Sequence, residues 1–276
     1  MPNFCAGLGL VFSFAAVILL VFSEVAQINS DLIPRHLRIV HIDTAGLGVA
    51  LASAAKQSAL ALAGANFTDI YAPAAVGEGY YVKATGQATH AGLYRGYEWG
   101  LWSYCATQGD LGAPRSYCYT RSIHPRFQPA QVLVEDIPAE YADLLQTVLP
   151  DNVFTADNYL GEYTQAATYL LMAGALATAL AALIGLFARR GAFVLGAVLS
   201  IVAFVGLFIG ATIWTVIVAR ARSAINDATT AGTDVGLTVE FGNALWIAWA
   251  ATALMLLSVL PFSIACCTGR SDAPRR

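Results

Sequence analysis

The sequence predicts an α-helical membrane protein, a four-helix transmembrane bundle that carries an external β-sheet domain. First, charged residues make up only 12% of the 276 residues, about half of the roughly 25% found in soluble domains. Second, the mean hydropathy is positive, at +0.60. Third, four uncharged stretches are long enough to cross a hydrocarbon core of about 30 Å, which takes about 20 helical residues. The net charge of -3 and the two lysines exclude the basic face of a nucleic-acid-binding protein.

The four predicted spans contain no Lys, Arg, Asp or Glu. They are residues 4–23, 164–188, 191–219 and 241–269. The first stretch is also open to a second interpretation, a cleaved signal peptide, because it lies at the N-terminus and small residues follow it. Its missing basic region and its length favour a retained anchor.

The distribution of arginines predicts the orientation. Arg189 and Arg190 form the only connection between the second and third spans, and positive connections tend to be cytoplasmic. The tail 270–276, with three arginines, then lies on the same side, as does the N-terminus. The segments 24–163 and 220–240 are therefore predicted to be external. Arg220 and Arg222, at the outer end of the third span, run against this tendency.

The apolar stretch Thr44–Ala65 is predicted to be a helix of the external domain, which could lie against the membrane face. A fifth span is the alternative. Lys56 and Gln57 at its centre disfavour that alternative, because a central lysine costs a span about 2.5–3.5 kcal/mol.

The five cysteines separate by compartment. Cys105 and Cys118 are external, where a disulfide forms and persists. Cys5, Cys266 and Cys267 lie at cytoplasmic span ends, and they are either S-acylation sites or inert thiols. Asn66 begins the sequon Asn66-Phe67-Thr68 in the external segment and is a candidate glycosylation site.

Catalytic and cofactor motifs are missing from the sequence. Neither lysine stands in a phosphate-binding loop, and the histidines show no zinc-ligand spacing, so we expect no enzyme, cofactor or metal site. The spans also lack the ionisable groups that are usual in pumps and proton-coupled transporters. One acidic pair, Glu135-Asp136, resembles a helix N-terminus, with Pro138 starting a helix that runs through Leu149.

Small residues in the third span predict close helix approach. They are Gly196, Gly206 and Gly210, the last two in a Gly-x-x-x-Gly pattern. Packing within the bundle is one interpretation, and a homo-oligomer contact is the other.

The most specific motif lies in the external segment. It is Gly100-Leu101-Trp102-x-x-Cys105, with Cys118 downstream. Aromatic and β-branched residues on both sides of residues 109–114 predict two strands joined by a turn, and Tyr80-Tyr81-Val82 predicts another strand. In a regular strand, Trp102 would lie on the face opposite Cys105 and anchor the sheet at the membrane interface or against the bundle.

This motif, with the long first loop and the four spans, resembles the claudin superfamily signature, and it looks most like the fungal Sur-seven/PalI family. The resemblance implies a claudin-like fold, and its motif residues here are Gly100, Leu101, Trp102, Cys105 and Cys118. It also implies a plasma-membrane protein that does non-enzymatic work.

Three functions compete on this basis. The first is an organiser of eisosome-type cortical membrane domains that supports cell-wall or membrane integrity and binds the lipid bilayer, further copies of itself or other cortical membrane proteins. The second is a sensor or accessory subunit in ambient-pH signalling or in calcium uptake during mating. The third, a pore or transporter, is disfavoured by the uncharged spans.

Overall fold

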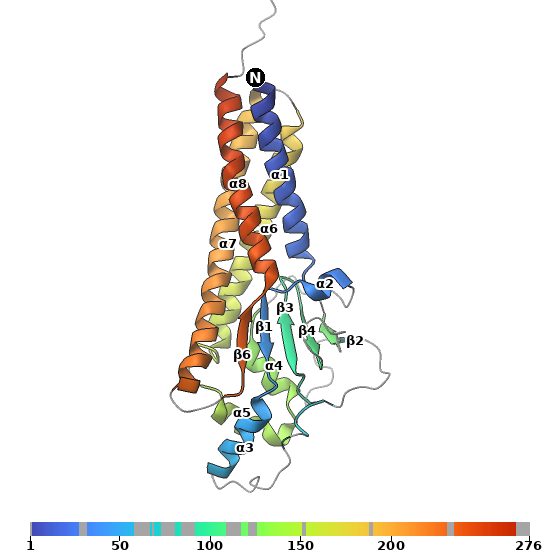
Figure 1. Cartoon of the computed structure of the whole chain (residues 1–276), viewed down its shortest axis with the longest axis vertical. Helices are drawn as coiled ribbons and strands as arrows, with labels where there is room; N and C mark the ends of the chain where they lie inside the picture. Colours follow the sequence, from blue (N-terminus) through green and yellow to red (C-terminus); the bar gives the residue numbers. More distant parts are fainter. Residues whose placement is uncertain are drawn as a thin grey trace, which may run out of the picture. The chain divides into compact units, whose positions relative to one another are not determined.

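The computed structural model (Figure 1) divides the chain into two compact units. The helical unit comprises Met1–Ser23, Ala167–Thr212 and Trp246–Arg276, and the sheet unit comprises Glu24–Ala166 and Ile213–Leu245. The residues that the structure describes are 2–27, 32–57, 67, 69–72, 81–83, 92–108, 117–120, 126–150, 153–187, 190–230 and 235–268.

Four long apolar helices confirm the predicted spans. They are α1 (Pro2–Glu24), α6 (Asp157–Gly185), α7 (Arg190–Thr230) and α8 (Asn243–Thr268), and each is long and apolar enough to cross a membrane. The α6 helix begins seven residues before the predicted span, and α7 continues eleven residues past it. These helices are longer than the uncharged stretches because polar residues with helical geometry continue a helix beyond the membrane and into water.

Within the helical unit, glycines let α6 and α7 approach closely. A Cβ added to Gly210 would lie 2.8 Å from the Leu171 side chain and 2.9 Å from the Ala167 carbonyl oxygen. A Cβ added to Gly206 would lie 3.3 Å from the Leu170 carbonyl oxygen. The two glycines of the Gly-x-x-x-Gly pattern therefore face α6 of the same chain.

One aromatic ring joins all four helices. Phe262 of α8 is fully buried and follows Pro261, which lies inside that helix. Cβ atoms added to Gly9 of α1, Gly185 of α6 and Gly196 of α7 would lie 3.2, 3.3 and 3.8 Å from its ring carbons. The missing side chains make room for the ring, which is the packing that small residues permit in membrane helices.

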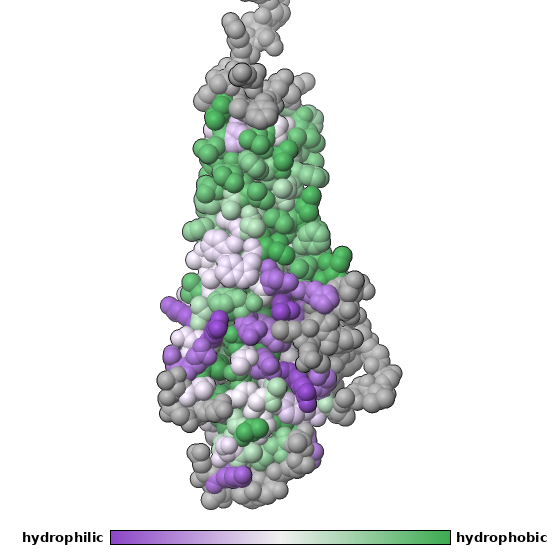
Figure 2. Space-filling view, viewed as in Figure 1, coloured by the Kyte–Doolittle hydropathy of each residue, from purple (hydrophilic) through white to green (hydrophobic). Residues whose placement is uncertain are grey.

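Large apolar side chains also cover the outside of the helical unit, as the green surface in Figure 2 shows. Val198, Ile201 and Val205 of α7 are among those that are exposed, and α1, α6 and α8 expose similar residues. Such a surface is stable in lipid and would aggregate in water. The protein is therefore a multi-pass membrane protein whose spans contact a lipid bilayer.

The described residues of the sheet unit form six short strands. They are β1 (Val40–Asp43), β2 (Tyr81–Lys83), β3 (Gly96–Trp99), β4 (Tyr104–Thr107), β5 (Tyr117–Tyr119) and β6 (Thr238–Phe241). Their order is β2-β5-β4-β3-β1-β6; β2 pairs parallel to β5, and all other pairs are antiparallel. The strands predicted around residues 109–114 and at Tyr80–Val82 are confirmed as β4, β5 and β2.

One face of the sheet is aromatic. The Trp99 ring stacks on Tyr104 at 5.4 Å and meets the edge of Phe127 at 5.1 Å. Phe127 in turn contacts Trp214, in the part of α7 that belongs to the sheet unit. Aromatic pairs in these geometries each contribute about 0.5–1.5 kcal/mol beyond the area they bury. This layer is the core of the sheet unit.

Short helices complete the sheet unit. They are α2 (Leu32–His36), α3 (Leu47–Gln57), α4 (Pro129–Asp136), the 3₁₀ turn η1 (Ala139–Tyr141) and α5 (Ala142–Val148). The described part of the apolar stretch 44–65 contains α3, whose 11 residues are about half of what a span needs.

The helix predicted from Pro138 is present as η1 and α5, and its expected apolar residues are buried: Ile137, Tyr141, Leu144, Leu145 and Val148. The interpretation of Glu135-Asp136 as a helix N-terminus is wrong, because both residues end α4. Asp136 is buried there, where it accepts hydrogen bonds from two tyrosines.

Candidate functional site

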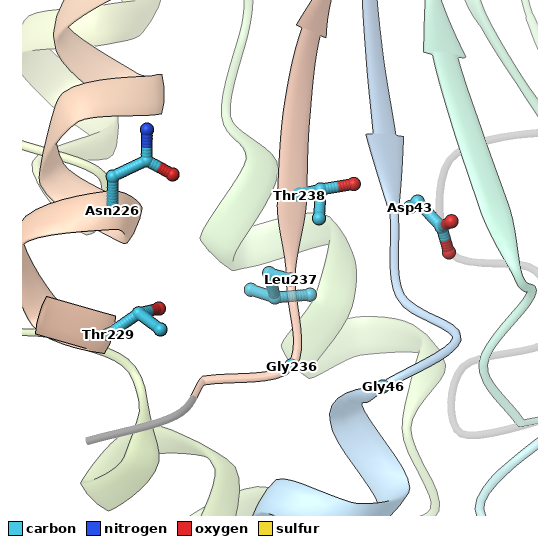
Figure 3. Close-up of a pocket in the computed structure, with 7 residues that line it drawn as sticks. All are labelled: Asp43, Gly46, Asn226, Thr229, Gly236, Leu237 and Thr238. Atoms are coloured by element: carbon cyan, nitrogen blue, oxygen red, sulfur yellow. The ribbon is translucent and has the colours of Figure 1, made fainter. Parts of the chain in front are cut away.

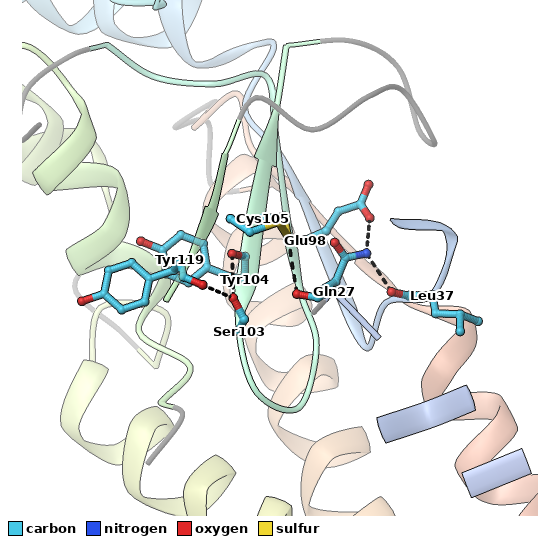
Figure 4. The surroundings of a disulfide bond; sticks show 8 residues. Gln27, Leu37, Glu98, Ser103, Tyr104, Cys105 and Tyr119 are labelled. Carbon is cyan, nitrogen blue, oxygen red and sulfur yellow. Dashed lines mark hydrogen bonds between the residues drawn. A yellow bond between two sulfur atoms is a disulfide. The ribbon is translucent and has the colours of Figure 1, made fainter. Parts of the chain in front are cut away.

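The predicted disulfide joins Cys105 of β4 to Cys118 of β5 (Figure 4). The two cysteines lie directly opposite each other in the antiparallel pair, and both are buried. The Cys105 sulfur lies 3.5 Å from the Gln27 carbonyl oxygen. This is a packing contact, because a disulfide sulfur carries no hydrogen to donate. The bond therefore fixes the register of the two strands beneath the segment that follows α1.

Gly100 lets this segment pass close to the sheet. A Cβ at this position would overlap the Ala26 carbonyl oxygen and would lie 3.0 Å from the Gln27 side chain. The Gly100 N–H donates to the Ser103 carbonyl oxygen at 2.9 Å and closes the turn between β3 and β4. Position 100 of the motif therefore requires a glycine, because the Ala26 backbone lies too close for a side chain.

Leu101 and Trp102 lie in that turn. Leu101 is buried, and the half-buried Trp102 donates its indole N–H to the Glu24 carboxylate at 2.8 Å. The condition for placing Trp102 on the face opposite Cys105, a regular strand, is not met, because residues 100–103 turn the chain between two strands. The indole therefore holds the last residue of α1 against the motif.

A buried carboxylate, which the sequence did not reveal, lies beside the disulfide. Glu98 of β3 is 0% exposed and pairs across the sheet with Cys105 on one side and His41 on the other. Its Oε2 accepts a hydrogen bond from the Gln27 amide at 3.0 Å and lies 3.9 Å from Arg38 Nη1. The only signal in the sequence was a single charge within an aromatic strand.

Gln27 connects this carboxylate to the backbone. Its amide also donates to the Leu37 carbonyl oxygen at 2.7 Å, and its own φ of 55° lies in the left-handed region that few side chains adopt. Because Glu98 and Gln27 are 71 residues apart, their bond ties the segment after α1 to the middle of the sheet. Removing either partner would leave a buried polar group without that bond.

A second buried carboxylate lies against the aromatic face. Asp136 Oδ2 accepts hydrogen bonds from the Tyr97 and Tyr117 hydroxyls at 2.8 and 2.7 Å. Burial raises the pKa of both phenols well above the ordinary value, and the nearby Asp136 charge raises it further. Both tyrosines therefore stay neutral and act as hydrogen-bond donors, which joins α4 to β3 and β5.

A pocket of about 440 Å³ lies where β1 ends and β6 begins (Figure 3). It is lined by Asp43, Gly46, Asn226, Thr229, Gly236, Leu237 and Thr238. The Asp43 carboxylate accepts a hydrogen bond from the Ala45 N–H at 2.7 Å, and Gly236, at a φ of +63°, packs against Gly46. The carboxylate therefore stabilises its own turn.

The remaining predicted sites cannot be placed at the level of side chains. Asn66 lies outside the described residues, and the side chains of Cys5, Cys266 and Cys267 are likewise outside the description. Across the described part of the chain, no three His, Cys, Asp or Glu side chains are grouped as metal ligands.

The four spans, the mixed sheet and the cross-strand disulfide define a class of multi-pass membrane protein in which long connections between helices build a disulfide-bonded sheet. The sequence model of the SUR7/PalI family matches residues 5–258, and the chain belongs to this family of membrane proteins, which are not known as enzymes. The search of curated proteins found no match.

Proposed function

We propose that the protein is a non-enzymatic organiser of eisosome-type domains in the cortical plasma membrane and that it supports cell-wall or membrane integrity. The observation that carries this proposal is that the buried polar groups of the sheet unit serve to hold its structure together. Glu98, Asp136 and the Cys105–Cys118 bond all hold strands and neighbouring segments together. A rigid domain of this kind suits a scaffold, and the family match over residues 5–258 supports the assignment.

The proposed topology has the sheet unit outside and both termini in the cytoplasm. Two arguments support it. The Arg189-Arg190 connection and the arginine-rich tail are both positively charged, and positively charged connections tend to stay in the cytoplasm. A structural disulfide in the sheet unit also suits an oxidising compartment, because cytosolic thiols are kept reduced. Asn66 would then be accessible to glycosylation, and Cys5, Cys266 and Cys267 to cytoplasmic S-acylation.

Lateral association with further copies or with other cortical membrane proteins would use the outer faces of the helices. Gly206 and Gly210 already face α6, and Gly196 faces Phe262, so their contacts lie inside the bundle. The α7 helix exposes a row of apolar residues that includes Val194, Val198 and Val205. This row is the surface that we assign to lateral contact.

Imaging of a fluorescently tagged copy tests the proposal, with a uniformly distributed plasma-membrane protein as control. We expect the tagged protein to form stable cortical patches. After deletion of the gene, we expect the cells to become sensitive to damage of the cell wall. A uniform distribution together with failure to grow at alkaline pH would contradict the organiser role and support a pH-signalling accessory subunit.

A second arm of the same experiment tests the part played by the sheet. Cys105→Ser and Cys118→Ser should each cost about 2–5 kcal/mol and retain the protein in the secretory pathway. The double variant should be no worse, since each single change already breaks the bond. Normal cortical patches in both single variants would show that the disulfide is dispensable for the role.

A further inference from the structure

A layer of small buried side chains crosses the helical unit next to Phe262. The α1 and α7 helices run in one direction and α6 and α8 in the other (Figure 1). About one helical turn from the level of the Phe262 ring, each helix therefore buries a further residue at a common level. These residues are Ser13 of α1, Ala181 of α6, Ser200 of α7 and Ser258 of α8, and all four are 0% exposed. Each is four residues from one of the positions that meet at the ring: Gly9, Gly185, Gly196 and Phe262 itself.

Two of the three serines in this layer lack a hydrogen-bond partner. The buried hydroxyls of Thr178, Thr252 and Ser258 each donate to a carbonyl oxygen of their own helix, at 2.8, 2.8 and 2.7 Å. The Oγ atoms of Ser13 and Ser200 have no partner among the described residues. Both residues lie within candidate membrane spans, where hydrocarbon surrounds the helices and an unpaired hydroxyl is costly. Two such hydroxyls at one level indicate a ligand that pairs with both.

The spacing of Ser13 and Ser200 fits one water molecule between their hydroxyls. Cβ atoms added to Gly9 and Gly196 would lie 3.2 and 3.8 Å from the same ring atom, Phe262 Cδ1, so the two positions are at most about 7 Å apart. Because α1 and α7 run in the same direction, Ser13 and Ser200 keep about this separation one turn further along. Two hydroxyls that both bind one water at about 2.8 Å lie up to about 5.5 Å apart. Hydroxyls that point inward from the two Cβ atoms meet this condition.

Ser258 supplies a third partner at the same level. Its hydroxyl donates to the Met255 carbonyl oxygen, and its oxygen lone pairs remain as acceptors. Buried waters in proteins make about three hydrogen bonds. The three hydroxyls are neutral, so they do not offset the dehydration of a cation. Phe262 and Met255, both fully buried, flank the layer along the bundle axis and restrict it to a small molecule.

From this arrangement we infer that the serine layer, Ser13, Ser200 and Ser258, binds a single buried water molecule. The water accepts hydrogen bonds from Ser13 and Ser200 and donates one to Ser258. It thereby holds α1, α7 and α8 in register at one depth of the bilayer. The site lies wholly within the helical unit, and it does not depend on the organiser role.

Water-edited solid-state NMR of the full-length protein in phosphatidylcholine bilayers tests the inference. The protein carries ¹³C-labelled serine and threonine, and the transfer of magnetisation from water protons to each side chain is measured. Loss of a signal in Ser13→Ala, Ser200→Ala or Thr252→Val assigns that signal. We expect transfer to Ser13 and Ser200 to be several-fold faster than to Thr252, a buried residue whose hydroxyl already bonds to the Ala248 carbonyl oxygen.

Removing the other hydroxyls of the serine layer should release the water. Ser13→Ala with Ser258→Ala leaves only Ser200, and one partner is too few for a buried water. The double variant should therefore lower the transfer to Ser200 several-fold. Thr252→Val, which removes a buried hydroxyl outside the layer at similar volume, should leave this transfer unchanged. An intact disulfide and a single gel-filtration peak establish that each variant is folded.

Two results would overturn the inference. The first is a wild-type transfer to Ser13 and Ser200 that is as slow as the transfer to Thr252. It needs no folded variant of the layer, and it would assign both hydroxyls to carbonyl oxygens of their own helices. The second is an unchanged transfer to Ser200 in the folded double variant.

Discussion

Asp136 should be among the side chains whose loss most weakens the sheet unit. It is buried, and its Oδ2 accepts hydrogen bonds from Tyr97 at 2.8 Å and from Tyr117 at 2.7 Å. Hydrogen bonds to a charged group contribute about 1.5–3 kcal/mol each. Asp136→Ala should therefore lower the opening free energy of the sheet by about 3–6 kcal/mol. Asp136→Asn keeps an acceptor oxygen in place and should cost about half as much.

Amide hydrogen exchange of the protein in lipid nanodiscs measures this quantity, because the protection of β3 and β4 reports the local opening free energy. Asp143→Ala on the exposed side of α5 is the matched control and should change protection by less than about 0.5 kcal/mol. In a Tyr97→Phe/Tyr117→Phe background, Asp136→Ala should cost clearly less, since the donors are already gone. Equal costs in both backgrounds, or a single-variant loss below about 0.5 kcal/mol, would refute the reasoning.

Three further predictions follow from the same contacts. Burial raises the pKa of Tyr97 and Tyr117, so their contribution to stability should be complete below about pH 10 and should fall as the pH rises above it. The phenolate absorbance of the wild type, compared with that of Tyr97→Phe/Tyr117→Phe, measures this ionisation. Ionisation of all tyrosines near pH 10 without unfolding would contradict the prediction. Gly100→Ala should destabilise the sheet by about 3 kcal/mol or more because its Cβ would overlap the Ala26 carbonyl oxygen, and unchanged exchange protection of β3 and β4 would contradict this. Phe262→Ala should lower the stability of the helical unit in detergent by about 3–5 kcal/mol, while the exposed Leu260→Ala should not, and equal effects would remove Phe262 from its central place in the bundle.

The features that could be predicted from the sequence are those that local composition determines. An uncharged stretch of 20 or more residues is sufficient evidence for a membrane-spanning helix, and all four such stretches form helices. Aromatic runs beside Cys105 and Cys118 were enough to predict a disulfide-bonded hairpin, because the two strands are close in sequence.

The features that were missed depend on contacts between distant residues. The β6 strand, four residues with one glutamate, pairs with β1 across about 200 residues, and no local pattern reveals that pairing. Glu98 meets Gln27 in the same way, across 71 residues. Asp136 was assigned to the wrong helix end because the pattern Asp-Ile-Pro fits a helix start, whereas the preceding Pro129 had already begun α4.

Trp102 shows how a motif can be recognised without its geometry being understood. The spacing between Trp102 and Cys105 suggested one regular strand, yet Gly100 and Ser103 turn the chain between two strands. The turn directs the indole to Glu24, a contact across 78 residues. Close passage of the segment after α1 explains both the glycine and the tryptophan, and only the fold reveals that passage.

The most direct test of the central claim, a sheet held by the Cys105–Cys118 bond and made in an oxidising compartment, is thiol tagging of protein taken from cells. In a Cys5→Ser/Cys266→Ser/Cys267→Ser background, Cys105 and Cys118 are the only cysteines left. The protein is denatured and treated with a maleimide of high mass, with and without prior reduction. We predict no tag before reduction and two tags after it, whereas one or two tags on the unreduced protein would contradict the account.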